Sequence, residues 1–247
     1  IADLNLDMSW VTLRVITRTM LSLDLTADLE RLCDAIVHVI AGAHIRAFLP
    51  AIFAQLPTPT NRRFKAAMSV INEELGTLIR DRRTTPSDKP DLISKILAVK
   101  DDAGRDAFDD QGIRDELVTI FLAGHETTAV TLAWTFYRLS AHPHWERVVV
   151  AEVDEVLGAD SPCTPDALRR MPIMTQFIHE VMRVHPPVWA FLRGLRTADK
   201  LPTRKVLPEG ARVLLMPYLT HRHPYFWENP EGFDPTRFAS SRLKSQH

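Results

Sequence analysis

Cysteine is scarce in this sequence, which has only Cys33 and Cys163 among 247 residues. The two lack CxxC spacing and nearby partner histidines, which excludes a disulfide framework and a common structural zinc site. Cys33 falls on the apolar face of a predicted helix and Cys163 falls in a proline-flanked loop. Both cysteines are therefore predicted to be structural.

An excess of charge and long apolar runs are also missing. Lys plus Arg number 30 against 31 Asp plus Glu, so the net charge of -1 gives no strong field for nucleic acid or an anionic membrane. Apolar runs such as 148–151 and 213–216 are too short to span a bilayer, and no signal pattern opens the chain. We expect a soluble, cytoplasmic protein with no membrane or nucleic-acid partner. Ile1 is not an initiator methionine, so we also expect upstream sequence.

What the sequence does contain is helical periodicity between short Pro and Gly breaks. The pattern predicts helices near 7–22, 27–45, 60–82, 90–99, 110–141, 143–157, 164–170 and 173–184. Asp109 or Asp110 can cap the longest helix, and Pro143 starts the next one, which Gly158 ends. After Arg183 the prolines favour hairpins and loops. The fold class is therefore mainly α with a smaller β region. We expect one partial domain over 1–247, helix-rich over 1–185 and rich in β and loop structure over 186–247.

The longest predicted helix carries Ala123-Gly124-His125-Glu126-Thr127-Thr128 at its centre. Glycine in mid-helix costs roughly 1 kcal/mol relative to alanine, and two threonines are modest helix formers. Such local violations concentrate at functional sites, where a flat ligand could approach Gly124 and where Glu126 and Thr127 could relay protons. The alternative is close helix packing at Gly124, with the threonine hydroxyls bonded back to backbone carbonyls.

A second constellation combines two distant segments. Glu180 and Arg183 share a helix face, and such pairs are usually solvated and weak. Downstream, Arg237 lies in Phe233-Asp234-Pro235-Thr236-Arg237-Phe238, held by a proline turn between aromatic residues. One carboxylate bound by two guanidinium groups would form a rigid buried cluster.

In this order, the motifs resemble the signatures of the cytochrome P-450 family of haem-thiolate monooxygenases. Residues 123–128 resemble its oxygen-activating segment, Glu180 and Arg183 its Glu-x-x-Arg pair, and 233–238 its Pro-x-Arg-Phe segment. Further matches are His185-Pro186-Pro187 followed by Arg193, then 207–210 and 218–224. The resemblance covers the chain up to Phe238, and jointly the motifs are much more specific than singly. It implies a partial cytochrome P-450 fold in which 110–141 is the long central helix.

The resemblance also implies roles for single residues. Glu126 and Thr127 would be catalytic and deliver protons during oxygen activation. The cofactor-binding residues would be Ala123, Gly124, Thr128 and Arg193, with Arg193 pairing a haem propionate and Arg196 as its alternative. Glu180, Arg183 and Arg237 would form a structural triad.

The family's pattern fails at its iron ligand. The family places this cysteine in a Phe-x-x-Gly-x-Arg-x-Cys-x-Gly loop soon after the Pro-x-Arg-Phe segment, and neither Cys33 nor Cys163 has that context. No metal ligand is assigned, and His142, His144, His221 and His223 lack a third ligand nearby. HExxH is not completed either, because Ala129 occupies its last position. We expect an internal fragment without the N-terminal region and the C-terminal ligand loop, inactive alone as a monooxygenase.

For the intact, bacterial-looking parent, the resemblance implies haem b, O₂ and a small apolar organic substrate. Electrons would come from an external redox partner, a ferredoxin or flavin reductase, or from a lost reductase domain, since no G-x-G-x-x-G or Walker sequence is present. The apolar residues Phe121, Leu122, Val188, Trp189 and Phe191 fit a substrate pocket or an ordinary core. The alternative function is a haem-free helical binding or scaffold protein derived from the same fold.

Overall fold

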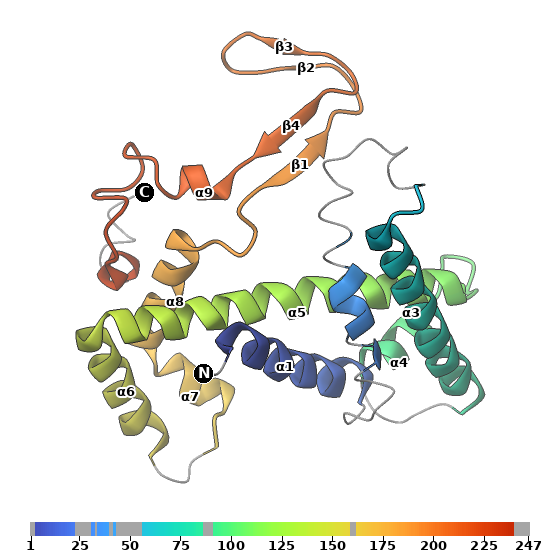
Figure 1. The fold of residues 1–247 in the computed structure, drawn as a ribbon, viewed down its shortest axis with the longest axis horizontal. Helices are drawn as coiled ribbons and strands as arrows, with labels where there is room; N and C mark the ends of the chain where they lie inside the picture. Colours follow the sequence, from blue (N-terminus) through green and yellow to red (C-terminus); the bar gives the residue numbers. More distant parts are fainter. Residues whose placement is uncertain are drawn as a thin grey trace. The chain divides into compact units, whose positions relative to one another are not determined.

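The computed structural model of the chain describes residues 3–22, 31–32, 34–39, 42, 56–85, 91–158 and 162–239. The chain divides into two compact units, Ile1–Ala129 and Val130–His247. The longest helix, α5 (Asp110–Ala141), runs from the first unit into the second (Figure 1). The described residues are mainly helical, with a smaller β region that belongs to the second unit, as the sequence predicts.

The helices of the first unit begin at capping side chains. Asp3 accepts from the backbone N–H groups of Asn5 and Leu6, and α1 (Leu4–Ile16) begins beside it. A π-helical segment, η1 (Thr17–Leu21), continues α1 directly. Helix α3 (Pro59–Thr84) begins after Thr58 and α4 (Leu92–Leu97) after Asp91, whose side chain accepts from the Ser94 N–H. These side chains satisfy N–H groups that have no partner within the helix.

Most predicted helices of the first unit lie within a few residues of the observed ones. The helix predicted over 7–22 begins earlier, at Leu4, because Asp3 caps it. The helix predicted over 27–45 lies partly outside the described residues, of which 31–32, 34–39 and 42 are helical. Asp109, one of two predicted caps, accepts from the Gly112 N–H of α5 at 2.7 Å.

Aliphatic side chains from every described helix fill the core of the first unit. The fully buried members include Leu21 of η1, Ile71 and Ile79 of α3, Ile93 of α4 and Ile113 of α5. Phe121, a candidate for the substrate pocket, also lies in this core and is 3% exposed. Its position matches the alternative that the sequence left open, an ordinary core residue.

The second unit packs three helices that each begin with proline. They are α6 (Pro143–Leu157), α7 (Pro165–Arg169) and α8 (Pro172–Val184). Proline fits the first turn because its missing N–H would have no partner there. Gly158 ends α6 with a φ of 58°, a backbone conformation that glycine adopts without strain. Val149, Phe177 and Val181 form a small core with Phe233 packed against it.

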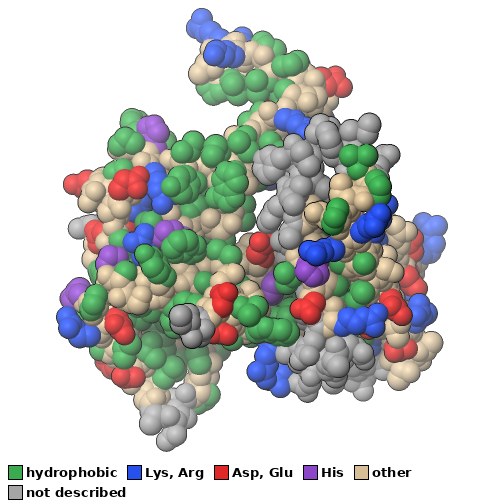
Figure 2. Space-filling model, in the orientation of Figure 1, with side chains coloured by type: hydrophobic (Ala, Val, Ile, Leu, Met, Phe, Trp, Pro, Cys, Tyr) green, Lys and Arg blue, Asp and Glu red, His purple; other side chains and the backbone are tan. Residues whose placement is uncertain are grey.

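The β region consists of two short antiparallel pairs. Strand β1 (Phe191–Gly194) pairs with β4 (Arg212–Leu215), and β2 (Asp199–Lys200) pairs with β3 (Val206–Leu207). Figure 2 shows hydrophobic side chains on the surface of these hairpins, at the top of the view. Short helices α9 (Pro217–Thr220) and η3 (Pro235–Phe238) follow. Val188 and Trp189, two further candidates for the substrate pocket, are about half exposed.

Helix α5 is long and apolar enough, by length and composition, to cross a membrane. The apolar runs of the sequence did not predict this. One such helix is weak evidence for a membrane, because the core helix of a soluble protein passes the same test.

Candidate functional site

The centre of α5 presents the 123–128 motif on two different faces. On the first face Ala123 is exposed and Thr127 is half-buried, and the Thr127 hydroxyl donates to the Ala123 carbonyl oxygen at 2.7 Å. Glu126 is also half-buried and Thr128 is exposed. This face therefore combines a hydroxyl group with an alanine that adds little bulk, and the Glu126 carboxyl group belongs to the neighbouring residue of the helix.

The second face of the motif packs against α1. A Cβ atom built on Gly124 would lie 2.8 Å from Ile16 Cδ1, so a larger residue there would force the end of the Ile16 side chain to move. The next residue, His125, is only 3% exposed. Both helix packing at Gly124 and a threonine hydroxyl bonded to the backbone are thus present, as the packing alternative expects. The roles of this motif toward a haem remain predictions.

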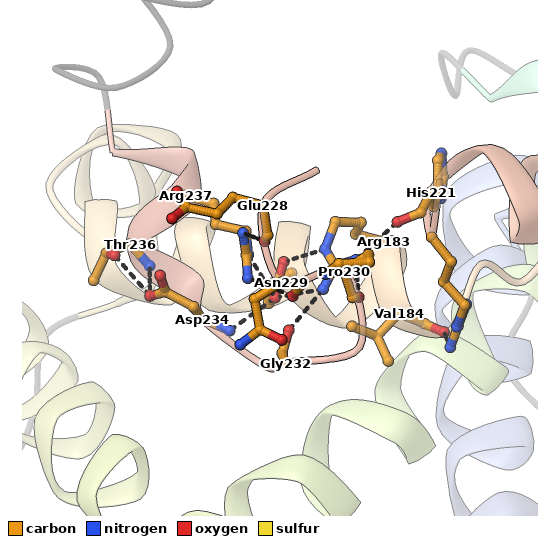
Figure 3. Close-up of polar contacts among 12 residues, drawn as sticks. Arg183, Val184, His221, Glu228, Asn229, Pro230, Gly232, Asp234, Thr236 and Arg237 are labelled. Atoms are coloured by element: carbon orange, nitrogen blue, oxygen red, sulfur yellow. Dashed lines mark hydrogen bonds and ion pairs between the residues drawn. The ribbon is translucent and has the colours of Figure 1, made fainter. Parts of the chain in front are cut away.

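Glu180 and Arg183 form a buried ion pair on α8, and Figure 3 shows the surroundings of Arg183. The Arg183 Nε and Nη2 atoms donate to the two Glu180 carboxylate oxygens at 2.7 and 2.8 Å. Arg183 also donates to the carbonyl oxygens of His221, Pro230 and Gly232 at 2.7 to 2.9 Å. One side chain therefore joins α8 to a segment about 40 to 50 residues further along the chain.

Arg237 joins the same carboxylate more loosely. Its Nε lies 3.4 Å from Glu180 Oε1 as an ion pair, and this nitrogen makes no hydrogen bond. Its Nη1 and Nη2 donate to the carbonyl oxygens of Glu228 and Asn229. The structure thus brings Glu180, Arg183 and Arg237 together, and Arg183 binds the carboxylate in the bidentate way. Figure 3 shows the two arginines of this cluster.

Arg193 is not part of this cluster. It lies exposed on β1, with its Cζ 5.2 Å from the centre of the Phe191 ring. Arg196, its alternative, is exposed in the turn that follows. The α5 motif belongs to the first unit and both arginines belong to the second. The pairing of Arg193 with a propionate stays a prediction.

The sequence analysis did not predict the contacts of His185, the residue that follows α8, with two residues of α5. The Arg138 Nε donates to His185 Nε2 at 2.9 Å, and the Trp134 ring stacks on the His185 ring at 3.7 Å. Burial, together with the positive charge of Arg138, lowers the pKa of His185 to about 4. The neutral ring can therefore accept from arginine at neutral pH. The signal in the sequence was the spacing of Trp134 and Arg138, which share a helix face.

A cavity of about 380 Å³ lies in the first unit, lined by Arg82, Arg83, Ser94, Leu97, Ala98, Lys100 and Asp106. Its three cations already have acidic partners. Arg82 pairs with buried Asp91, Arg83 with Asp106 and Asp110, and Lys100 with Asp106. The cavity therefore offers a ligand little uncompensated charge.

The described residues fit one side of the haem that the resemblance implies. The α5 face with Ala123 and Thr127 combines low bulk with a hydroxyl, which suits the approach of a flat group. A thiolate donor is not supplied by the described residues, because Cys163 is exposed in the loop before α7. Cys33 lies outside them. Among the described residues, no group of three or more His, Cys, Asp or Glu could hold a metal ion.

The mainly helical fold, the α5 motif and the Glu180 cluster are the features that the sequence resemblance predicted, and comparison with known proteins assigns the family. The family model for cytochrome P-450 matches residues 2–247. The chain belongs to the cytochrome P-450 family.

Named relatives agree with this assignment. Cyclooctatin synthase of Streptomyces melanosporofaciens is 34% identical over 245 residues, which are 98% of this chain and 53% of that protein. Pentalenene oxygenase of Streptomyces avermitilis is 33% identical over 95% of this chain and 52% of its own length. The haem domain of cytochrome P450DA has a similar solved structure, with a TM-score of 0.83, 25% identity and coverage of 98% of this chain and 53% of that one. Human and mouse members of the family match as well. The chain spans about half the length of the curated relatives it matches.

Proposed function

We propose that the protein of which this chain forms part is a haem-dependent monooxygenase that inserts one oxygen atom from O₂ into an apolar organic substrate. The observation that carries the proposal is the family match over 2–247. Helix α5, which carries a hydroxyl and a carboxyl group on the consecutive half-buried residues Thr127 and Glu126, supports it. The chain itself is one partial cytochrome P-450 domain, helix-rich over 1–185 and rich in β and loop structure over 186–247.

Each predicted site residue has a task that its side chain can perform. Haem b, when bound, supplies the oxidising chemistry through its iron. Thr127 holds a proton at Oγ1, and Glu126 exchanges it through its carboxyl group. Ala123, Gly124 and Thr128 are assigned to the α5 surface against the haem, where Gly124 would contribute backbone alone because Ile16 occupies its side-chain position. Arg193 binds a propionate. Glu180, Arg183 and Arg237 keep α8 in place and do not touch the reacting atoms.

The partners follow from the same proposal. Electrons come from an external redox protein, a ferredoxin or flavin reductase, or from a reductase domain of the longer protein. A relative named for pentalenene supports an apolar substrate. We place the protein in the bacterial cytoplasm, without a membrane or nucleic-acid partner, and the Streptomyces relatives support this source.

The absorbance spectrum of the reduced protein, with and without carbon monoxide, tests the proposal. For protein purified from its natural source we expect a red-shifted Soret band of the thiolate type, because thiolate ligation gives this band. We expect no such band for the 247-residue chain alone. A natural-source protein without a haem band would overturn the proposal and leave the haem-free scaffold.

A matched variant identifies the source of any thiolate signal. Cys163 is the exposed cysteine of the described residues, and Cys163→Ser should leave the band of the natural-source protein unchanged. Loss of the band in this variant would place the ligand at Cys163 and contradict the family's arrangement.

A further inference from the structure

His125 is a buried titratable group with no task in the proposed reaction. Its side chain is 3% exposed, and both ring nitrogens, Nδ1 and Nε2, are buried without a hydrogen-bond partner among the described residues. Buried polar groups are nearly always hydrogen-bonded, and each exception requires an explanation. The ring belongs to the residue directly before Glu126, so a change at His125 would affect the part of α5 that carries the predicted catalytic residues.

Helix α1 lies against this part of α5. Ile16 Cδ1 occupies the space where a side chain on Gly124 would stand. The nearby Ser9 backbone raises the pKa of His125. Neither ring nitrogen makes a hydrogen bond of ordinary geometry with the described residues. The buried Thr12 hydroxyl already donates to the Ser9 carbonyl at 3.0 Å. The ring thus lies near a helix whose Ser9 carbonyl already accepts a hydrogen bond and which supplies no carboxylate to a charged imidazole there.

Few charges compensate a proton on this ring. Glu126 of the same helix attracts it. The charged residues of α1, Asp7 and Arg14, are both exposed and lie away from the buried face of that helix. A charged imidazole would therefore be buried with the Glu126 carboxylate and the Ser9 backbone as its only favourable neighbours among the described residues.

We propose that His125 is an acid-sensitive latch, so that α1 stays packed on residues 124–125 of α5 only while the imidazole is neutral. Protonation releases α1 because the charged ring gains water only when that helix moves away. The latch acts on the part of α5 that carries Glu126 and Thr127. It does not depend on the proposed function, since it requires no haem.

The direction of the pH effect follows from burial. Burial lowers the pKa of His125, and this outweighs the Ser9 backbone and Glu126, which both raise it. With α1 released, the pKa returns toward its ordinary value of about 6.5. The released state binds more protons between these two pKa values, so it gains population as pH falls below about 6.5.

Hydrogen exchange of the 247-residue chain tests the latch. Exchange rates of α1 amides, divided by the intrinsic rate at each pH, should rise by up to about tenfold per pH unit below pH 6.5, as one linked proton dictates. Amides of α3, which belongs to the same unit as α1, serve as the internal reference. Unchanged or slower relative exchange of α1 at pH 5 than at pH 7 would overturn the proposal.

Two variants separate the latch from general acid sensitivity. His125→Leu places an apolar side chain, which cannot bind a proton, in the core. It should abolish the pH dependence of α1 exchange. His144→Leu removes an exposed histidine and should leave that dependence intact. If His125→Leu fails to fold, NMR titration of the His125 ring in the unmodified chain decides. A ring that titrates near pH 6.5 while α1 exchange stays constant contradicts the proposal.

Discussion

Arg183 can be buried because every N–H donor of its guanidinium group has an acceptor. It is 2% exposed and makes five hydrogen bonds, two to Glu180 and three to backbone carbonyl groups. The sequence predicted the pairing with Glu180 and the participation of Arg237. It could not predict the carbonyl acceptors at 221, 230 and 232, because any residue supplies a carbonyl group and only the chain path selects these three.

Arg183→Ala should lower the free energy of unfolding by about 3–5 kcal/mol, because it leaves the buried Glu180 carboxylate with only the looser Arg237 pair and the Asp234 N–H among the described residues. Urea unfolding followed by tryptophan fluorescence measures this loss. Arg169 provides the control, since it pairs with Asp166 at the same i, i+3 spacing but is exposed. Arg169→Ala should cost less than about 1 kcal/mol. Equal losses in the two variants would contradict the assigned importance of burial.

At the scale of elements, Glu152 fixes where α8 begins relative to α6. Its two carboxylate oxygens accept from the Ile173 and Met174 N–H groups, each at 2.8 Å. These N–H groups belong to the first turn of α8 and have no partner within the helix. A carboxylate at this end also interacts favourably with the helix dipole.

Glu152→Ala should therefore lower the free energy of unfolding by about 1–2 kcal/mol and reduce helicity, because two N–H groups lose their acceptors. Circular dichroism during urea unfolding reads out both effects. Glu152→Gln keeps one oxygen acceptor and should cost less. Glu155→Ala changes an exposed residue of the same helix and should have little effect. A loss as large in Glu155→Ala as in Glu152→Ala would show that general helix propensity, and not capping, sets the stability.

Elements with local start and stop signals were the predictable part of this fold. Pro143 and Gly158 mark α6 in the sequence, and Asp109 marks the start of α5. Long-range partners gave no such signal. Glu152 is a charged residue one turn after buried Val149, and only the position of α8 reveals what it binds. The burial of His125 is similar, because it depends on where α1 packs. The motif around Gly124 was predicted as unusual, while its contact with Ile16 was not.

For the molecule as a whole, four histidines with a lowered pKa make the folded chain less stable as pH falls. Burial is the main cause that lowers the pKa of His125, His142, His185 and His221. The positive charge of nearby arginines lowers the pKa of the last three further. Each binds more proton in the unfolded chain below its ordinary pKa of about 6.5. The contribution of these histidines to the free energy of unfolding is therefore fully present above pH 6.5. It decreases as pH falls toward the lowered pKa values, which reach about 4 for His185.

The free energy of unfolding should thus fall by roughly 2 kcal/mol or more between pH 7.5 and pH 5, after allowance for the partial exposure of three of these rings. Urea unfolding at the two pH values measures the difference. The acidic groups with lowered pKa, Asp91, Asp101 and Asp106, act below their ordinary value near 3.8 and contribute little in this window. His185→Gln should reduce the difference, because it removes the most strongly shifted ring, whereas His144→Gln should not. A free energy of unfolding that is constant from pH 7.5 to pH 5 would mean that these rings are not protected from water in the folded chain.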